Sequence, residues 1–172
     1  FVPSIELMER AGKSCYEIIK GNIQKEDTIL VVCGGGGNGG DGLVIARYLL
    51  QDNYQVFVYL TSNHLKEETG INLKRYKGSI IKDLDEFIKT HQVKVIIDAI
   101  FGVGLNTKIK ENYVTLINKL NLIDAYKVSI DINSGLDSTS GQALGALFKS
   151  NLTITIQDYK SGLFLNEGKG SY

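Results

Sequence analysis

The sequence lacks an excess of charge of either sign. Its 172 residues include 19 Lys and Arg against 19 Asp and Glu, so the formal net charge at pH 7 is +0. A protein that binds nucleic acid or an anionic membrane surface needs a positive electrostatic field. We therefore expect no nucleic-acid partner and no membrane partner, and instead a small molecule or another protein.

Long apolar runs are also absent. No stretch approaches the roughly 20 apolar residues of a membrane span. No charged segment is followed by the apolar run and small-residue cleavage site of a signal peptide. These absences predict a cytoplasmic chain.

Cysteine is scarce. The two cysteines, Cys15 and Cys33, both lie in apolar patterns, so we interpret them as small core side chains rather than a disulfide or a metal site. The chain is otherwise rich enough in apolar residues, at 43%, to bury a sizeable core. Its length predicts one domain.

Helical and strand patterns alternate along the chain. Several continuous apolar runs are typical of parallel strands that are covered on both faces. This order predicts a doubly wound α/β fold, a Rossmann-like three-layer sandwich around a mostly parallel sheet. The strand patterns cover residues 28–33, 55–60, 80–81, 94–98, 127–131 and 152–156, and the helical patterns cover 4–21, 42–50, 64–76, 85–90 and 113–120.

Seven glycines lie within residues 34–42, between the first predicted strand and a helix. Bare backbone there can approach a ligand, and free N–H groups can bind an anion; a merely tight turn is the alternative.

A dinucleotide dehydrogenase needs an acid after the second strand, but residues 61–64 read Thr-Ser-Asn-His. A P-loop would need Lys where Asp41 stands. We expect Asp41 to accept ribose or amide hydrogen bonds, or to cap the helix.

Two aspartates, Asp98 and Asp131, lie at the ends of predicted parallel strands. Ligands of open α/β sheets bind beyond such ends, where the glycine segment also opens. Each carboxylate can bind a cation, act as acid or base, or only cap a loop. Together Asn38, Asp98 and Ser134 offer oxygen ligands and one formal charge, which favours a hard, weakly held cation over zinc or copper.

Three further polar residues have less specific surroundings. Lys160 follows the last predicted strand, where it can reach a phosphate, pair with a carboxylate or remain in solvent. His64 and His91 lie in polar segments without a nearby Ser or Asp pattern, so we expect both at the surface.

Four ordered motifs carry a family resemblance. They are residues 7–12, 32–47, 98–105 and 130–141, and the similarity continues to 160–163. In these motifs the sequence resembles the NAD(P)H-hydrate epimerases, the YjeF N-terminal domain. The resemblance implies one such epimerase domain over 1–172, which interconverts the R and S forms of NADH or NADPH hydrated at C6. An S-specific dehydratase, its functional partner, could then repair both forms.

The resemblance also implies a site. Asn38, Asp98 and Ser134 would bind a potassium ion (K+). Asp131 would be catalytic, because inversion at C6, by loss and return of the hydroxyl or by ring opening and closure, needs proton transfer beside a developing cation. The implied substrate contacts are Gly37, Asn38, Gly39, Gly40, Asp41, Gly102, Val103, Gly104, Leu105, Asn106, Thr107, Lys108 and Asp131.

The sequence departs from the family pattern beside this site. Gly35 and Gly37 stand for the Pro and the first Asn of the family's Gly-Pro-Gly-Asn-Asn loop, and Asn133 stands for the Pro before Ser134. The alternative function is a non-catalytic Rossmann-like binding or dimerisation module. Such relatives are expected to lose the site residues, which are present here.

We expect a homodimer built on the leading helix. One apolar stripe of this helix can be buried by the sheet, and the residues beside it need another cover; the resemblance points the same way. Packing of Tyr16 on a neighbouring helix is the alternative. The stripe comprises Leu7, Met8, Ala11, Cys15, Ile18 and Ile19, and the residues partly off it are Val2, Ile5 and Tyr16.

Overall fold

Six parallel strands form the central sheet of the computed structural model, which describes residues 2–172. The strands are β1 (Thr28–Cys33), β2 (Gln55–Leu60), β3 (Ser79–Ile81), β4 (Val95–Ala99), β5 (Tyr126–Ile130) and β6 (Leu152–Ile154). Their order is β3-β2-β1-β4-β5-β6, so the direction of winding reverses between β1 and β4. The predicted doubly wound α/β fold is confirmed.

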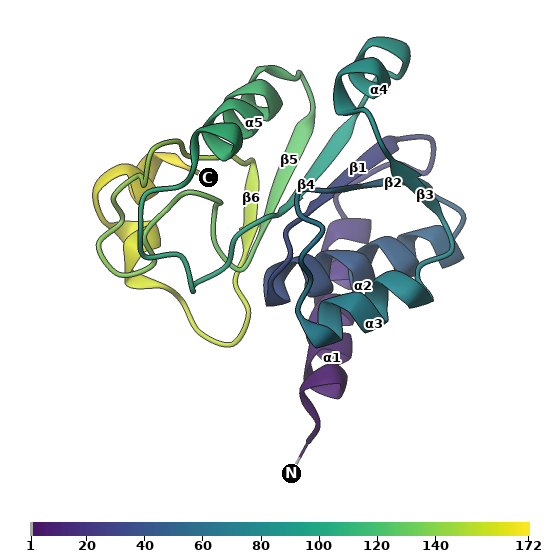
Figure 1. The fold of residues 1–172 in the computed structure, drawn as a ribbon, viewed down its shortest axis with the longest axis horizontal. Helices are drawn as coiled ribbons and strands as arrows, with labels where there is room; N and C mark the ends of the chain where they lie inside the picture. Colours follow the sequence, from purple (N-terminus) through teal and green to yellow (C-terminus); the bar gives the residue numbers. More distant parts are fainter. Residues whose placement is uncertain (1) are drawn as a thin grey trace.

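Helices cover both faces of the sheet, as Figure 1 shows. On one face lie α1 (Ser4–Lys20), α2 (Gly37–Gln51) and α3 (Glu67–Arg75), and on the other lie α4 (Leu84–Thr90) and α5 (Glu111–Leu122). Two short 3-10 helices, Ser161–Phe164 and Asn166–Gly170, follow β6.

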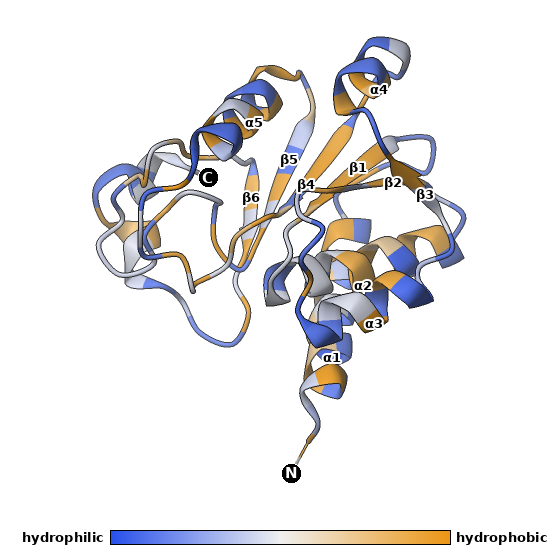
Figure 2. Ribbon diagram, in the orientation of Figure 1, coloured by the Kyte–Doolittle hydropathy of each residue, from blue (hydrophilic) through white to orange (hydrophobic). Residues whose placement is uncertain are grey.

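Alternate residues of β1 belong to different cores. Ile29 and Val31 pack with α1 and α2, whereas Leu30 and Val32 pack with α4 and α5. Figure 2 shows the same arrangement, with apolar strands between helices whose outer faces are polar. Burial on both faces explains the continuous apolar run in the sequence. Among residues 2–172, no helix has the length and apolar character needed to cross a membrane.

Helix α2 begins inside the glycine cluster, so the prediction that it starts at residue 42 was wrong. Its first residue is Gly37, and Gly36 is the N-cap. Glycine disfavours helix, but here it permits close packing. A Cβ on Gly39 would collide with the carbonyl oxygen of Gly34, and one on Gly42 would lie 2.6 Å from the Cβ of Ala99.

The apolar stripe of α1 is buried over only part of its length. Cys15 and Ile19 are buried, as predicted, but Leu7 and Ile18 are 49% and 46% exposed. For Tyr16 the alternative is confirmed: its ring stacks on a tyrosine of α2 at a centroid distance of 5.4 Å, so it needs no cover from another subunit. The prediction of a buried stripe was wrong for Leu7 and Ile18, because α2, and not the sheet alone, decides which face of α1 is covered.

Candidate active site

A cavity of about 460 Å³ opens beyond the carboxyl ends of β1 and β4. It lies where the winding of the sheet reverses, the usual ligand position in such folds. Its charged lining residues are Asp41, Lys66 and Asp131, and we call the cavity the crevice. The rest of the lining consists of Gly35, Gly36, Gly37, Asn38, Ile100, Phe101, Gly102, Val103, Gly104 and Leu105.

The structure brings eight of the thirteen expected substrate contacts into this lining. They are Gly37, Asn38, Asp41, Gly102, Val103, Gly104, Leu105 and Asp131. Gly39 and Gly40 instead face packed atoms of the protein. The other three, Asn106, Thr107 and Lys108, are exposed and lie outside the lining.

The two carboxylate oxygens of Asp131 have different hydrogen-bond partners. Its backbone has a φ of 69°, in the left-handed region that is uncommon for a residue other than glycine, and this ends β5 one residue earlier than predicted. Oδ1 accepts hydrogen bonds from the backbone N–H of Ile156 at 3.2 Å and from Nζ of Lys160 at 2.5 Å. Oδ2 accepts none from residues 2–172 and lies 3.5 Å from an ideal Cβ position on Gly102, another residue of the crevice.

The second carboxylate of the crevice, Asp41, is the fifth residue of α2 and therefore does not cap that helix. It accepts no hydrogen bond from the residues that the structure describes. Burial, with a smaller contribution from the charge of Asp131, raises the pKa of Asp41 to about 7. Near neutral pH a substantial fraction of Asp41 is therefore protonated and able to donate a proton.

Asp98 lies behind the crevice, fully buried. Its carboxylate accepts hydrogen bonds from the N–H of Ser134 at 2.9 Å and from the hydroxyl of Ser129 at 3.0 Å, and also from the Ser134 hydroxyl and the N–H of Ile100. Burial raises the pKa of Asp98 to about 6, and these hydrogen bonds limit the rise. The Ser134 hydroxyl in turn accepts from the N–H of Phe101 at 3.0 Å, and so joins Asp98 to the crevice wall.

Asn38 is buried with both amide atoms unpaired. It is 9% exposed, and neither Oδ1 nor Nδ2 has a hydrogen-bond partner among residues 2–172. An unpaired buried amide is costly, so it marks a place where a ligand completes the site. An amide oxygen is one of the oxygen ligands that hard cations take in proteins. No group of three His, Cys, Asp or Glu in the described chain could hold a softer metal.

Helix α3 supports the glycine segment from outside. The Thr69 hydroxyl donates to the carbonyl oxygen of Gly36 at 2.8 Å, and the backbone N–H of Lys66 donates to that of Gly35 at 2.8 Å. A Cβ on Gly35 would collide with the carbonyl oxygen of His64, so this loop has no room for the family's proline. The helix predicted over residues 64–76 is present, over the shorter range Glu67–Arg75.

Asn133, the other departure from the family pattern, is hydrogen-bonded through both atoms of its amide. The two protons of its Nδ2 are shared among three acceptors: the carbonyl oxygens of Phe148 and Ser171, at 3.0 and 2.7 Å, and the hydroxyl of Ser150, at 2.9 Å. Its Oδ1 accepts from the hydroxyl of Thr153 at 2.7 Å. These contacts fix the loop that carries Ser134.

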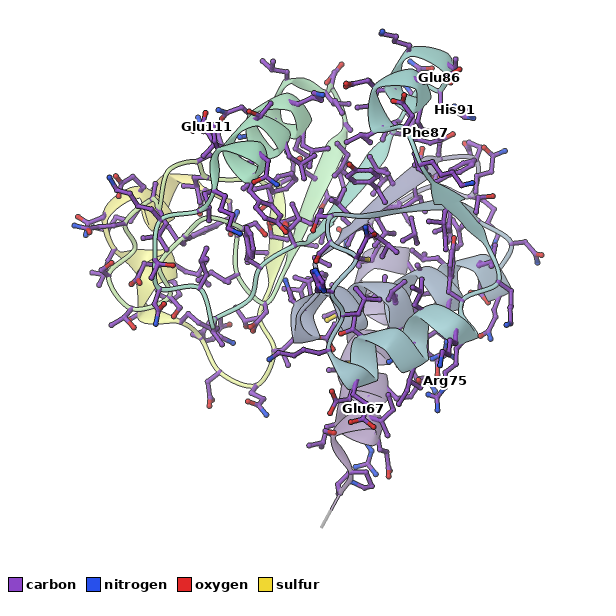
Figure 3. All side chains as sticks on the ribbon, viewed as in Figure 1. Glu67, Arg75, Glu86, Phe87, His91 and Glu111 are labelled. Atoms are coloured by element: carbon purple, nitrogen blue, oxygen red, sulfur yellow. The ribbon has the colours of Figure 1, made fainter. Side chains whose placement is uncertain are left out.

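The structure also places the lysine, the histidines and the cysteines that the sequence singled out. Lys160 pairs with Asp131, one of the three alternatives expected for it, and both side chains are 14% exposed. His64 and His91 are exposed, as predicted, and Figure 3 shows His91 beside Phe87 at α4. Cys15 and Cys33 are buried free thiols, as predicted.

Sequence reasoning missed Lys66 altogether. This lysine is the N-cap residue of α3 and lines the same crevice as the two carboxylates. Its signal in the sequence is weak, because it is one of several charged residues in a polar segment. Lys66 reaches the site because the segment after β2 packs against the glycine segment, where the backbone N–H of Lys66 donates to the carbonyl oxygen of Gly35.

Comparison with known proteins finds a matching family and relatives that cover most of this chain. Residues 4–162 match the model of the family described as YjeF-related protein N-terminus. A protein of Elusimicrobium minutum named NAD(P)H-hydrate epimerase is 36% identical, over 91% of this chain and 76% of its own. The protein of Methanothermobacter thermautotrophicus named bifunctional NAD(P)H-hydrate repair enzyme Nnr is 35% identical, and the match covers 95% of this chain but 34% of that protein.

The fold also has a solved counterpart. The crystal structure of yeast ynu0 superimposes with a TM-score of 0.81, over 94% of this chain and 74% of the yeast chain, at 24% sequence identity. At that identity the likeness establishes the shared fold.

Proposed function

This chain belongs to the YjeF-related protein N-terminus family, and we propose that it is an NAD(P)H-hydrate epimerase, an isomerase that interconverts the R and S forms of hydrated NADH or NADPH. Relatives with that name match most of the chain at 31–36% identity. Within the structure, the observation that carries the proposal is the meeting of Asp41 and Asp131 in one crevice. A non-catalytic module would have no need for these two carboxylates.

The two carboxylates suit the two proton transfers that epimerisation requires. Loss of the C6 hydroxyl needs a proton on the leaving oxygen and leaves an iminium ion, and addition of water to the other face returns that proton. Opening and closing the ring also moves one proton each way. Asp41, with its raised pKa, suits the acid, and Asp131, beside the cation of Lys160, suits the base.

The same arrangement suits a positively charged intermediate. An ionised Asp131 with an unpaired Oδ2 can stabilise the developing iminium by a charge interaction, which contributes on the order of several kcal/mol in a site closed to water. We assign Asp131 the catalytic role for this reason.

The phosphates of the dinucleotide need positive groups, and the crevice offers two. The N-terminus of α2 begins at Gly37, after an N-cap glycine that has no side chain to pair with the first N–H groups. Lys66 lines the crevice beside this end. We assign the phosphates to this part of the crevice and the nicotinamide ring to the part beside Asp131.

We also propose K+ as the cofactor, held by Asn38, Asp98 and Ser134. The unpaired amide of Asn38 and the hydroxyl of Ser134 fit a cation that takes oxygen ligands. Bound there, K+ would supply positive charge near the loops that meet the substrate. The existing hydrogen bonds of Asp98 and Ser134 then orient these ligands.

The remaining parts of the proposal concern partners. An S-specific dehydratase is the functional partner, and two relatives named as bifunctional repair enzymes support such a linked activity. We propose a homodimer that covers the exposed Leu7 and Ile18 of α1. We propose a cytoplasmic location, where buried free thiols stay reduced.

The proposal is tested with mixed R and S hydrates of NADPH and an S-specific dehydratase. The dehydratase alone should consume the S form and leave the R form. Addition of this chain should make the R form disappear as well, and the Asp131→Asn variant should not. Persistence of the R form with the unmodified chain would refute the function.

A further inference from the structure

We propose that Lys160 is the positioning residue of the reaction: it holds Oδ1 of Asp131, so that Oδ2 faces the substrate. The inference rests on the proposed function and adds to it a residue that does not touch the crevice. Lys160 lies outside the lining of the cavity, so it acts through Asp131.

The contacts of Lys160 fix its ammonium group on two sides. Nζ donates to Oδ1 of Asp131 at 2.5 Å and to the backbone carbonyl oxygen of Ile156 at 2.6 Å. The N–H of Ile156 donates to the same Oδ1 at 3.2 Å. A side chain and a peptide group that follow β6 therefore clamp a carboxylate that follows β5.

The clamp acts on one oxygen only. Two groups donate to Oδ1. Turning the carboxyl group of Asp131 about its Cβ–Cγ bond, away from the observed orientation, would break both contacts. Oδ2 accepts no hydrogen bond from residues 2–172 and lies on the Gly102 side, toward the crevice. The clamp thus leaves one oxygen unpaired where a substrate proton or a developing positive charge can meet it.

The backbone conformation and the burial of Asp131 agree with such a clamp. A φ of 69° is uncommon outside glycine, although aspartate adopts it more readily than most residues, and it persists when the surroundings hold it. Lys160 is 29 positions along the chain, and both partners are only 14% exposed. A poorly hydrated ion pair contributes little net stability compared with apolar side chains of the same size. Its presence beside the reacting carboxylate is better explained by orientation.

The test compares Lys160→Met and Lys160→Arg with the unmodified chain, in steady-state epimerisation of NADPH hydrate. Lys160→Met should lower kcat at least about 30-fold with KM changed less than about threefold, because the substrate contacts remain. Lys160→Arg keeps the cation and should recover kcat to within about fivefold. For Lys160→Ala, ethylamine added to the buffer should restore part of kcat, since a small ammonium ion can occupy the vacated place.

The matched control is Lys20→Met. Lys20, the last residue of α1, also pairs with an aspartate, Asp52, at 2.8 Å, but this pair lies on the surface. This variant should keep kcat within twofold. Thermal unfolding of every variant separates loss of orientation from loss of fold.

A double-mutant cycle supplies the second measurement. Once Asp131→Asn has removed the carboxylate, adding Lys160→Met should lower kcat less than twofold further, because the two residues act as one unit. Additive losses would overturn the proposal. So would a Lys160→Met variant with normal kcat, or one whose loss lies in KM alone.

The controls distinguish this inference from the proposed function. If the unmodified chain does not epimerise the hydrate, the function fails and the inference fails with it. If the unmodified chain is active and Lys160→Met is equally active, only the role of Lys160 is refuted. If Lys160→Met does not fold, Lys160→Gln, which can still donate to the carbonyl oxygen of Ile156, takes its place in every comparison.

Discussion

The carboxylates of Asp41 and Asp131 border the same crevice, and the charge of Asp131 adds to burial in raising the pKa of Asp41 to about 7. One residue belongs to the first turns of α2, and the other follows β5. A carboxyl group with a raised pKa beside a second carboxylate can serve as a proton donor without a histidine. This pair leads to the first two predictions.

Replacement of Asp131 by Asn should lower the rate of epimerisation more than about 100-fold, because the amide neither accepts a proton nor carries charge. The change is nearly isosteric, so the thermal midpoint should stay close to that of the unmodified chain. The rate is measured by the coupled dehydratase assay. Activity within a fewfold of the parent would remove Asp131 from the catalytic role.

Stability should depend on pH through Asp41. Its pKa of about 7 in the folded state exceeds the value of about 4 in the unfolded chain, so the native state binds the proton more tightly. This contribution is fully present below pH about 4 and is lost as the pH rises through 7. In urea titrations, Asp41→Asn should therefore be more stable than the parent at pH 8 by roughly 1–3 kcal/mol, relative to their difference at pH 4. Parallel pH profiles for the two proteins would contradict this.

Potassium should stabilise the fold by binding to the native state. With K+ in excess over its dissociation constant, the thermal midpoint should exceed that measured in tetramethylammonium at equal ionic strength. Ser134→Ala removes one proposed ligand and should abolish most of the difference. Equal midpoints in the two salts for the parent protein would argue against the ion.

Asn133 should contribute strongly to stability. Asn133→Ala removes every hydrogen bond of a buried amide and leaves buried partners unpaired, so we expect a loss of about 2–4 kcal/mol in the free energy of unfolding. Asn22→Ala is the matched control, because its exposed amide donates one bond to Ile18, and it should cost less than about 1 kcal/mol. Similar losses for the two variants, from urea titration, would refute a special role for Asn133.

The homodimer is tested by sedimentation at micromolar concentration. A mass near twice 18.9 kDa is expected for the parent, because the exposed Leu7 and Ile18 border an apolar groove of about 470 Å³ between α1 and the end of β6. Leu7→Glu should shift the protein toward the monomer, since a charge would be buried at the interface. A monomeric parent would refute the dimer.

The order of helices and strands was predictable from the sequence, because it depends on local patterns. A run such as residues 28–33 is apolar throughout because both faces of β1 are covered. The parallel arrangement then places the glycine cluster, Asp98 and Asp131 at one edge of the sheet, whatever the details of packing. The position of the crevice was therefore already implicit in the sequence.

Contacts between distant segments decided the rest. The start of α2 at Gly37 depends on close packing against other backbone, although the glycines themselves disfavour a helix. The pattern within α1 left open whether a second subunit or a neighbouring helix covers Tyr16, and the packing of α2 decides for the helix. The clamp of Lys160 on Asp131 joins residues 29 positions apart through a strained φ. Local periodicity is set by a few neighbouring residues, but which oxygen of a carboxylate stays unpaired depends on the whole fold.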